Sequence, residues 1–208
     1  MRVVVVGCEY TGVTTLIDGL YEWGNQRGIH HHLDDHFTIP DAFHLSEEEQ
    51  KAMLEMLPAI KERFQRFQIV YHVRLLQLFE HILMGGFHIE EMVYGPKYYY
   101  PGINIEVREY EPEMPEDTIL VHLVARPEVI RERMQSTPHP HQLVPSEDVP
   151  EILDRFDEEY RKSWIKRKFT IDTSDLSPQQ LLDTFLEESV PYLNIRDMLT
   201  RQGTKISG

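Results

Sequence analysis

Short apolar runs alternate along the chain with segments in which apolar residues recur every three or four positions. Residues 2–6 are almost uniformly apolar, as is typical of a strand buried on both faces of a sheet. Four further runs with strand character are 29–35, 87–92, 118–125 and 168–172. Helical spacing of apolar residues fills the intervals between these runs. The alternation predicts an α/β fold with a five-stranded, mainly parallel sheet flanked by helices.

The predicted helices have recognisable ends. The segments with helical spacing are 14–27, 46–84 with a break at Pro58, 127–135, 148–167 and 177–186. Ser46 followed by Glu49 forms a capping-box pattern, and Ser177 before Pro178 is typical of a helix start. The glycine pair at 85–86 is predicted to stop the long second helical region, so that the third strand follows it.

Composition indicates one domain in this chain of 208 residues, and we expect it to span 1–193 with a polar tail over 194–208. No apolar stretch reaches the length of a membrane span, so no membrane partner is expected. The net charge of −14 argues against general nucleic-acid binding. The lone Cys8 excludes an internal disulfide and fits a reducing cytoplasm, which is the expected location.

The pattern Gly-x4-Gly-x-Thr follows the first strand candidate, at Gly7, Gly12 and Thr14. In phosphate-binding loops, this spacing between a strand and a helix directs backbone N–H groups at phosphates. Val13 stands where the motif carries a lysine, whose charge reaches the outer phosphates. The predicted nucleotide-binding residues are Gly7, Cys8, Glu9, Tyr10, Thr11, Gly12, Val13, Thr14 and Thr15. The alternative is an ordinary strand–turn–helix whose glycines make a tight turn.

With three later segments, the loop resembles the P-loop nucleoside and nucleotide kinases of the thymidylate kinase and deoxynucleoside kinase group. The later segments are 90–98, 121–133 and 169–178. In the first of them, Glu90, Tyr94 and Lys97 match in kind an acidic residue, a tyrosine and a basic residue of that group. The resemblance covers 1–186 in strand order and implies a P-loop NTPase fold.

The sequence also departs from this group. Glu91 stands where the group has the arginine of its E-R-S motif. Segment 134–147 is similar in position to the LID, the flap that closes over ATP, yet it lacks the arginines that neutralise the transferring phosphoryl group. Arg131 and Arg133 lie just before it. The candidates to replace the loop lysine are Lys97, Arg126, Arg131 and Arg133.

The resemblance implies roles for residues outside the loop. The expected Mg²⁺ ligands are Thr14, Glu90 and Glu91. The candidate catalytic residues, which would orient the acceptor hydroxyl or neutralise charge, are Asp34, Asp35, Glu90, Arg131 and Arg133. The candidate substrate-binding residues are Gln68, Arg74, Tyr94, Lys97 and Tyr98. Plainer interpretations stay open: a turn cap for the aspartates, a solvated strand end for the glutamates and core packing for the long helix.

Three functions are therefore open. The first is a kinase that uses ATP (or another NTP) and Mg²⁺ to phosphorylate a nucleoside, a nucleoside monophosphate or a similar small-molecule acceptor. The second is a nucleotide-binding pseudo-kinase that acts as a sensor or interaction module, because the loop lysine and the flap arginines are missing. The third is a scaffold that binds no nucleotide. A homodimer through the long helical region, as in similar kinases, is a further expectation.

Overall fold

The computed structural model of the protein describes residues 1–33, 45–139 and 141–201, so the predicted catalytic residues Asp34 and Asp35 lie outside the described residues. The strands are β1 (Arg2–Val6), β2 (His32–Leu33), β3 (Ile82–Gly85), β4 (Thr118–Val124) and β5 (Arg167–Asp172). The main helices are α1 (Val13–Asn25), α2 (Glu47–Leu54), α3 (Pro58–Leu78), α4 (Phe87–Tyr94), α5 (Pro127–Ser136), α6 (Val149–Lys162), α7 (Pro178–Glu188) and α8 (Ile195–Arg201).

The five strands form one parallel sheet in the order β2-β3-β1-β4-β5. This confirms the predicted α/β fold. The strand β1 is central, and its Val3 lies opposite Leu83 of β3 and Ile119 of β4. All strands therefore end at the same edge of the sheet. From the end of β1 the chain continues into α1 on one face of the sheet, whereas the neighbouring strand β3 continues into α4 on the other face. Open α/β sheets bind their ligands in the crevice at such a point.

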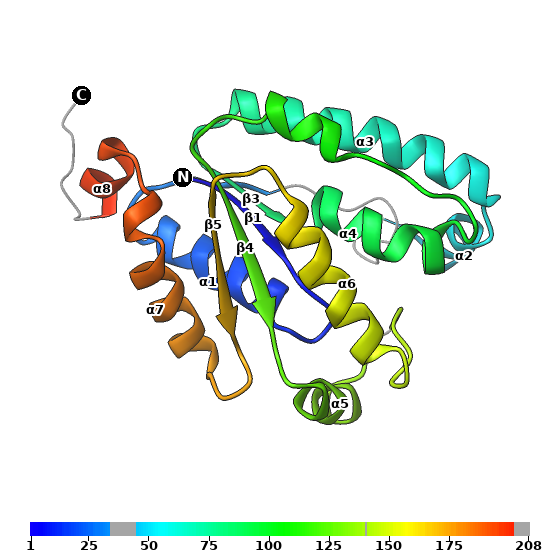
Figure 1. The fold of residues 1–208 in the computed structure, drawn as a ribbon. Helices are drawn as coiled ribbons and strands as arrows, with labels where there is room; N and C mark the ends of the chain where they lie inside the picture. Colours follow the sequence, from blue (N-terminus) through cyan, green and yellow to red (C-terminus); the bar gives the residue numbers. More distant parts are fainter. Residues whose placement is uncertain (34–44, 140, 202–208) are drawn as a thin grey trace.

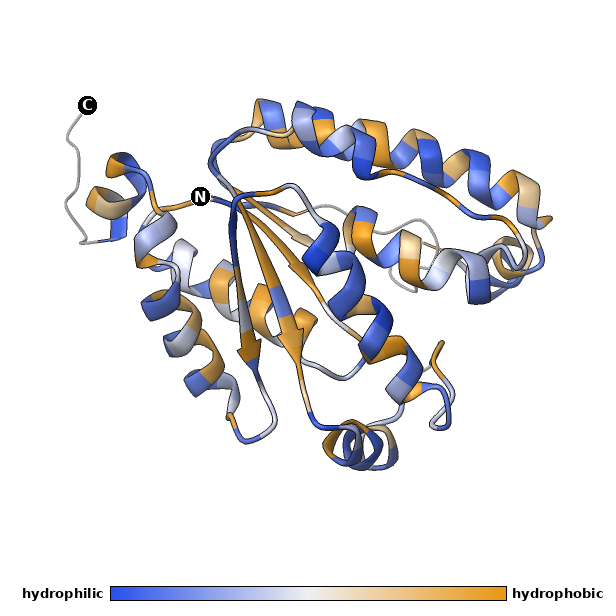
Figure 2. Ribbon diagram, in the orientation of Figure 1, coloured by the Kyte–Doolittle hydropathy of each residue, from blue (hydrophilic) through white to orange (hydrophobic). Residues whose placement is uncertain are grey.

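Helices cover both faces of the sheet (Figure 1). Val3 and Val5 belong to the core beneath α1 and α7, whereas Val4 and Val6 belong to the core shared with α3, α4 and α6. Strands β1 and β4 are apolar along most of their length, whereas β5 is mostly polar (Figure 2). A strand buried on both faces needs this continuous apolar sequence, because successive side chains point to opposite layers.

The third strand and the helix after it differ from the prediction of a helix to residue 84 and a strand at 87–92. The long helix α3 ends at Leu78, β3 occupies Ile82–Gly85, and residues 87–94 form α4. Gly86 (φ 78°) and Phe87 (φ 52°) turn the chain from strand into helix, so the glycine pair ends a strand. Because nearly every residue of α4 is buried, its sequence has no polar face to separate a helix from a buried strand.

Helix α6 ends at Lys162 rather than at the predicted residue 167, which belongs to β5, whereas the starts of α2 and α7 follow local sequence. The capping boxes at Ser46 and Ser177 are both formed, and each accepts the expected backbone N–H. Residues 103–107 contain no strand, and part of the predicted polar tail forms α8. In the described part of the chain, no helix is long and apolar enough to cross a membrane.

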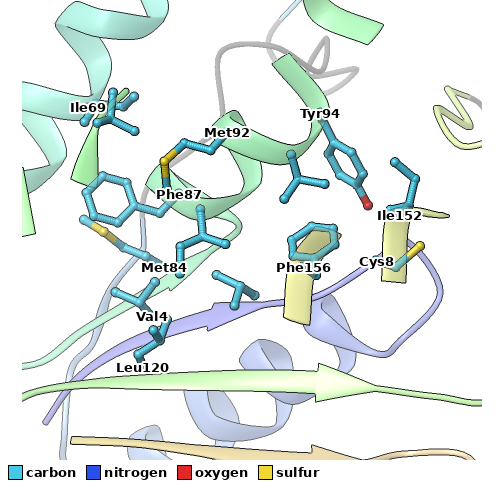
Figure 3. Close-up of a cluster of buried hydrophobic side chains, with 14 of the residues drawn as sticks. Val4, Cys8, Ile69, Met84, Phe87, Met92, Tyr94, Leu120, Ile152 and Phe156 are labelled. Atoms are coloured by element: carbon cyan, nitrogen blue, oxygen red, sulfur yellow. The ribbon is translucent and has the colours of Figure 1, made fainter. Parts of the chain in front are cut away.

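Large side chains fill the core between the sheet and α4 and α6 (Figure 3). Phe156 of α6 is completely buried, and its ring meets that of Tyr94 edge-on at 5.2 Å between centroids. Tyr94 lies at the end of α4 and also reaches the loop after β1. This packing therefore connects the interior of the domain to the predicted phosphate-binding loop.

We expect Phe156→Ala to lower the free energy of unfolding by about 3–5 kcal/mol, because it removes a buried ring and leaves a cavity. Urea denaturation measures the change. Trp164→Ala is the matched control, since Trp164 is 60% exposed and its loss should change the stability by about 0.5 kcal/mol or less. Equal effects of the two substitutions would contradict the described packing.

Candidate functional site

The loop after β1 makes a turn that only glycine fits. A Cβ atom on Gly7 would lie 2.5 Å from Thr11 Oγ1 and 2.6 Å from the carbonyl oxygen of Leu123 in β4. Gly12 has φ of 100° and immediately precedes α1. The two glycines of the motif thus occupy positions where a side chain would collide with the sheet or strain the backbone. The glycines of the predicted loop therefore occupy positions at which the backbone requires glycine.

The start of α1 presents backbone donors without partners. The amides of Val13, Thr14 and Thr15 make no hydrogen bond to any described residue, and α1 has no side-chain cap and no acidic residue in its first turn. The first N–H groups of a helix carry partial positive charge and lack intrahelical acceptors. They therefore form a ready anion-binding surface at the mouth of the loop.

A cavity of about 500 Å³ lies over this surface. Its lining residues come from the loop, the end of β3, α4, the end of α5, the segment after it and the start of α7: Gly7, Cys8, Glu9, Tyr10, Thr11, Gly12, Val13, Thr14, Thr15, Gly85, Gly86, Glu90, Tyr94, Arg133, Thr137, His139, Thr173, Leu176, Ser177, Pro178 and Leu181. All nine predicted loop residues line it, as do Glu90, Tyr94 and Arg133. Its volume is in the range of small-molecule sites.

Arg133 holds the backbone segments that surround the cavity. Its guanidinium donates to the carbonyl oxygen of Tyr10 (2.8 Å) and to the carbonyl oxygen of Thr173 (2.7 Å). The Thr173 hydroxyl in turn donates to the carbonyl oxygen of Thr11 (2.8 Å). The loop is thus held from α5 and from the end of β5. Arg133 adds positive charge to the cavity wall, but these donors already have acceptors.

Two carboxylates give the cavity an acidic side. Burial raises the pKa of Glu90 to about 7, against the opposing effect of a hydrogen bond from the Tyr99 hydroxyl (3.1 Å). Burial also raises the pKa of Glu9, although two backbone N–H groups, of Val144 and Leu143, donate to its carboxylate. The negative charge of Glu90 raises the pKa of Glu9 further through like-charge repulsion.

Tyr94 and Cys8 complete the wall beside the loop. The backbone N–H of Glu9 donates to the Tyr94 hydroxyl (2.8 Å), so one loop amide already has a partner. Burial raises the pKa of the Cys8 thiol to about 12, which keeps it protonated at neutral pH. Cys8 is consequently a packing residue of the loop and no nucleophile.

The other candidate cations do not line the cavity. Lys97 lies 2.6 Å from a carboxylate oxygen of Glu151 and also pairs with Asp148. The Arg126 guanidinium donates to both carboxylate oxygens of Asp175 (2.8 Å each), and that of Arg131 donates to the carbonyl oxygen of Ser146. Among the described residues that line the cavity, the basic side chains are Arg133 and His139.

Four further candidates also lie outside the cavity lining. Glu91 is fully buried and accepts a hydrogen bond from the Tyr100 hydroxyl (2.6 Å). Tyr98 donates to Asp148 (2.8 Å). Gln68 is partly buried on α3, and Arg74 on the same helix is exposed and bonds Gln77. The structure therefore brings together the loop, Glu90, Tyr94 and Arg133, and separates them from these four.

Several lining residues carry no sequence signal of their own. His139 and Thr137 follow α5, Thr173 lies in the connection between β5 and α7, and Leu181 belongs to α7. Gly85 is the last residue of β3 and Gly86 follows it, so both reach the cavity from the strand that the sequence-based prediction misplaces. Their position in the chain could have indicated them, because most lie at or after the end of a strand or helix that ends at the same edge of the sheet as the loop.

A metal ion has a limited donor set here. No group of three or more His, Cys, Asp or Glu side chains among the described residues is arranged to hold a metal. Of the three predicted Mg²⁺ ligands, Thr14 and Glu90 line the cavity. Both offer oxygen, which Mg²⁺ prefers, and Mg²⁺ commonly takes one or two protein ligands with phosphate oxygens and water.

Comparison with known proteins places the fold. No family model matches the chain, and no curated protein matches it in sequence. Its structure is similar to the YorR protein from Bacillus subtilis, solved in complex with phosphorylated GDP, with a TM-score of 0.57 and 16% identity over 93% of this chain and 99% of that chain.

It is also similar to deoxyadenosine kinase from M. mycoides. The form with bound dATP gives a TM-score of 0.59 and 12% identity over 90% of this chain and 98% of the kinase. The form with bound dCTP gives 0.58 and 11% over the same shares. Together with the parallel sheet and the loop after β1, these likenesses show that the chain has the fold of the P-loop nucleoside and nucleotide kinases.

Proposed function

We propose that this protein binds a nucleotide in the cavity, with the phosphates on the loop of residues 7–15. The observation that carries the proposal is the set of unpartnered amides of Val13, Thr14 and Thr15 at the cavity floor. Donors of this kind, together with the positive end of α1, stabilise bound anions. The similar structures were solved with nucleotides bound, which supports a nucleotide as the anion.

The affinity for a triphosphate alone should be modest. Val13 replaces the lysine, Arg133 is engaged by carbonyl oxygens, and Glu9 and Glu90 add negative charge. Mg²⁺ would offset this charge. Thr14 and Glu90 would hold it against the phosphate oxygens, where it would neutralise charge on the phosphates.

Phosphoryl transfer to a nucleoside or nucleoside monophosphate is the second candidate function. Glu90 favours it, because the Mg²⁺ that it would hold with Thr14 would neutralise charge on the transferring phosphoryl group. Transfer also needs cations at the phosphoryl group, and Arg133 supplies the guanidinium in the described lining. We therefore propose binding as the principal function and slow transfer as its extension.

Restoring the lysine should strengthen binding. We expect Val13→Lys to bind ATP with Mg²⁺ roughly 10- to 100-fold more tightly than the wild type, because a charge-assisted contact contributes about 1.5–3 kcal/mol. Isothermal titration calorimetry measures both affinities. Gln26→Lys, at the exposed far end of α1, adds the same charge away from the cavity and should leave the affinity within twofold. Absence of nucleotide binding in both wild type and Val13→Lys would contradict the proposal.

Transfer is tested by incubating the protein with ATP, Mg²⁺ and a panel of nucleosides and nucleoside monophosphates. If transfer occurs, Glu90→Gln should lower its rate by about 10²- to 10⁴-fold, because the carboxylate that would hold Mg²⁺ is lost while the shape is kept. Glu132→Gln, an exposed change on α5, is the control. A chain that binds ATP and phosphorylates none of the panel would exclude transfer to these acceptors and leave the binding function in place.

The raised pKa of Glu90 also makes a stability prediction. An unfolded glutamate ionises near pH 4.3, so between that pH and about 7 the folded chain holds more protons and loses stability as the pH rises. Glu90→Gln removes this loss. We expect its stability relative to that of the wild type to increase by on the order of 2–3 kcal/mol between pH 5 and pH 8. Urea denaturation at both pH values measures this, and an equal effect at the two values would contradict it.

A further inference from the structure

Two side chains of the phosphate-binding loop form hydrogen bonds to the segment that follows α5. We call residues 137–139 and 141–144 the flap. The Glu9 carboxylate accepts hydrogen bonds from the backbone N–H groups of Leu143 (3.0 Å) and Val144 (2.8 Å). Two successive amides on one carboxylate are charge-assisted bonds, roughly twice as strong as neutral ones. They join positions that are more than 130 residues apart in the sequence.

Tyr10, the next residue of the loop, holds the flap at a second place. Its hydroxyl accepts from the backbone N–H of His139 (2.9 Å) and donates to Gln142 Oε1 (3.1 Å). Its ring stacks on the His139 ring at 4.1 Å between centroids, with an angle of 15° between the planes. Tyr10 also has φ of 67°, a left-handed conformation that is uncommon outside glycine. The strained backbone directs this side chain at the flap.

Glu9 also lines the cavity whose floor is the anion-binding surface. A bound phosphate would bring its negative charge beside the Glu9 carboxylate, to which Glu90 adds a second like charge. Repulsion between two unit charges several ångströms apart is substantial at the low effective dielectric of such a site. A bound phosphate is therefore repelled by the ionised Glu9 carboxylate, which is the group that bonds the closed flap.

We propose that Glu9 is a latch that holds the flap closed in the absence of ligand, and that phosphate binding to the loop releases it. The proposal rests on the proposed function for its second half. The coupling has the opposite sign to that of a lid that closes on its ligand. Because such coupling is reciprocal, opening the latch must raise the affinity for phosphate by the same factor by which phosphate favours the open flap.

Hydrogen–deuterium exchange of the peptide that covers Leu143 and Val144 tests the latch without any ligand. We expect Glu9→Ala to exchange these amides at least tenfold faster than the wild type, because both lose a charged acceptor. Glu9→Gln keeps the shape and should give an intermediate rate. Glu147→Gln, an exposed carboxylate in the segment between the flap and α6, removes the same charge without touching the latch and should change nothing. Wild-type exchange in Glu9→Ala would overturn the latch.

Inorganic pyrophosphate tests the coupling, since it carries the charge without a base or sugar. We expect saturating pyrophosphate to speed the exchange of these amides in the wild type, and Glu9→Gln to bind it at least fivefold more tightly by calorimetry. Slower exchange with pyrophosphate bound would overturn the proposed sign. A chain that binds neither pyrophosphate nor ATP would overturn the proposed function and the coupling together, whereas the exchange rates of the unliganded variants decide the latch independently.

Discussion

The close approach of the loop to β4 is the constraint on which the site depends. The backbone at Gly7 passes so near the carbonyl oxygen of Leu123 that no Cβ atom fits between them. This approach sends the chain over the carboxyl end of the sheet and lets α1 start directly behind it. The orphan amides at the start of α1 then point into the space above the strands. A single missing side chain thus sets the position of the anion-binding surface.

The same geometry explains why the cavity is short of available positive charge. The loop exposes carbonyl oxygens on its far side, at Tyr10 and Thr11, and these need donors because they are removed from water. Arg133 and the Thr173 hydroxyl supply them. An arginine used in this way stabilises the loop but has fewer donors left for a ligand. The sequence around Arg133 cannot reveal that choice, because its acceptors lie 123 residues before it, at Tyr10, and 40 residues after it, at Thr173.

The parts of the fold that sequence could predict are those encoded locally. The loop, the capping boxes at Ser46 and Ser177 and the buried strands each have a pattern within a few residues, and the structure contains them. Helix α4 could not be predicted in this way. A helix that is buried on all sides lacks the periodic alternation of apolar and polar residues that distinguishes a helix from a strand. Likewise Lys97, which follows α4, and Arg126, which follows β4, pair with carboxylates outside the cavity. Sequence supplies the type of charge, while the fold decides its neighbours.

The charge balance of the cavity leads to one last consequence. Glu9 and Glu90 are costly to ionise where they lie, and their pKa values are raised for that reason. Any anion that settles on the loop raises this cost further unless a proton, a metal ion or a movement of Glu9 compensates. The first two responses neutralise charge in place, whereas the third gives up the bonds to Leu143 and Val144. The Glu9 carboxylate, which holds the flap closed, is therefore also the group that responds to the charge of a bound ligand.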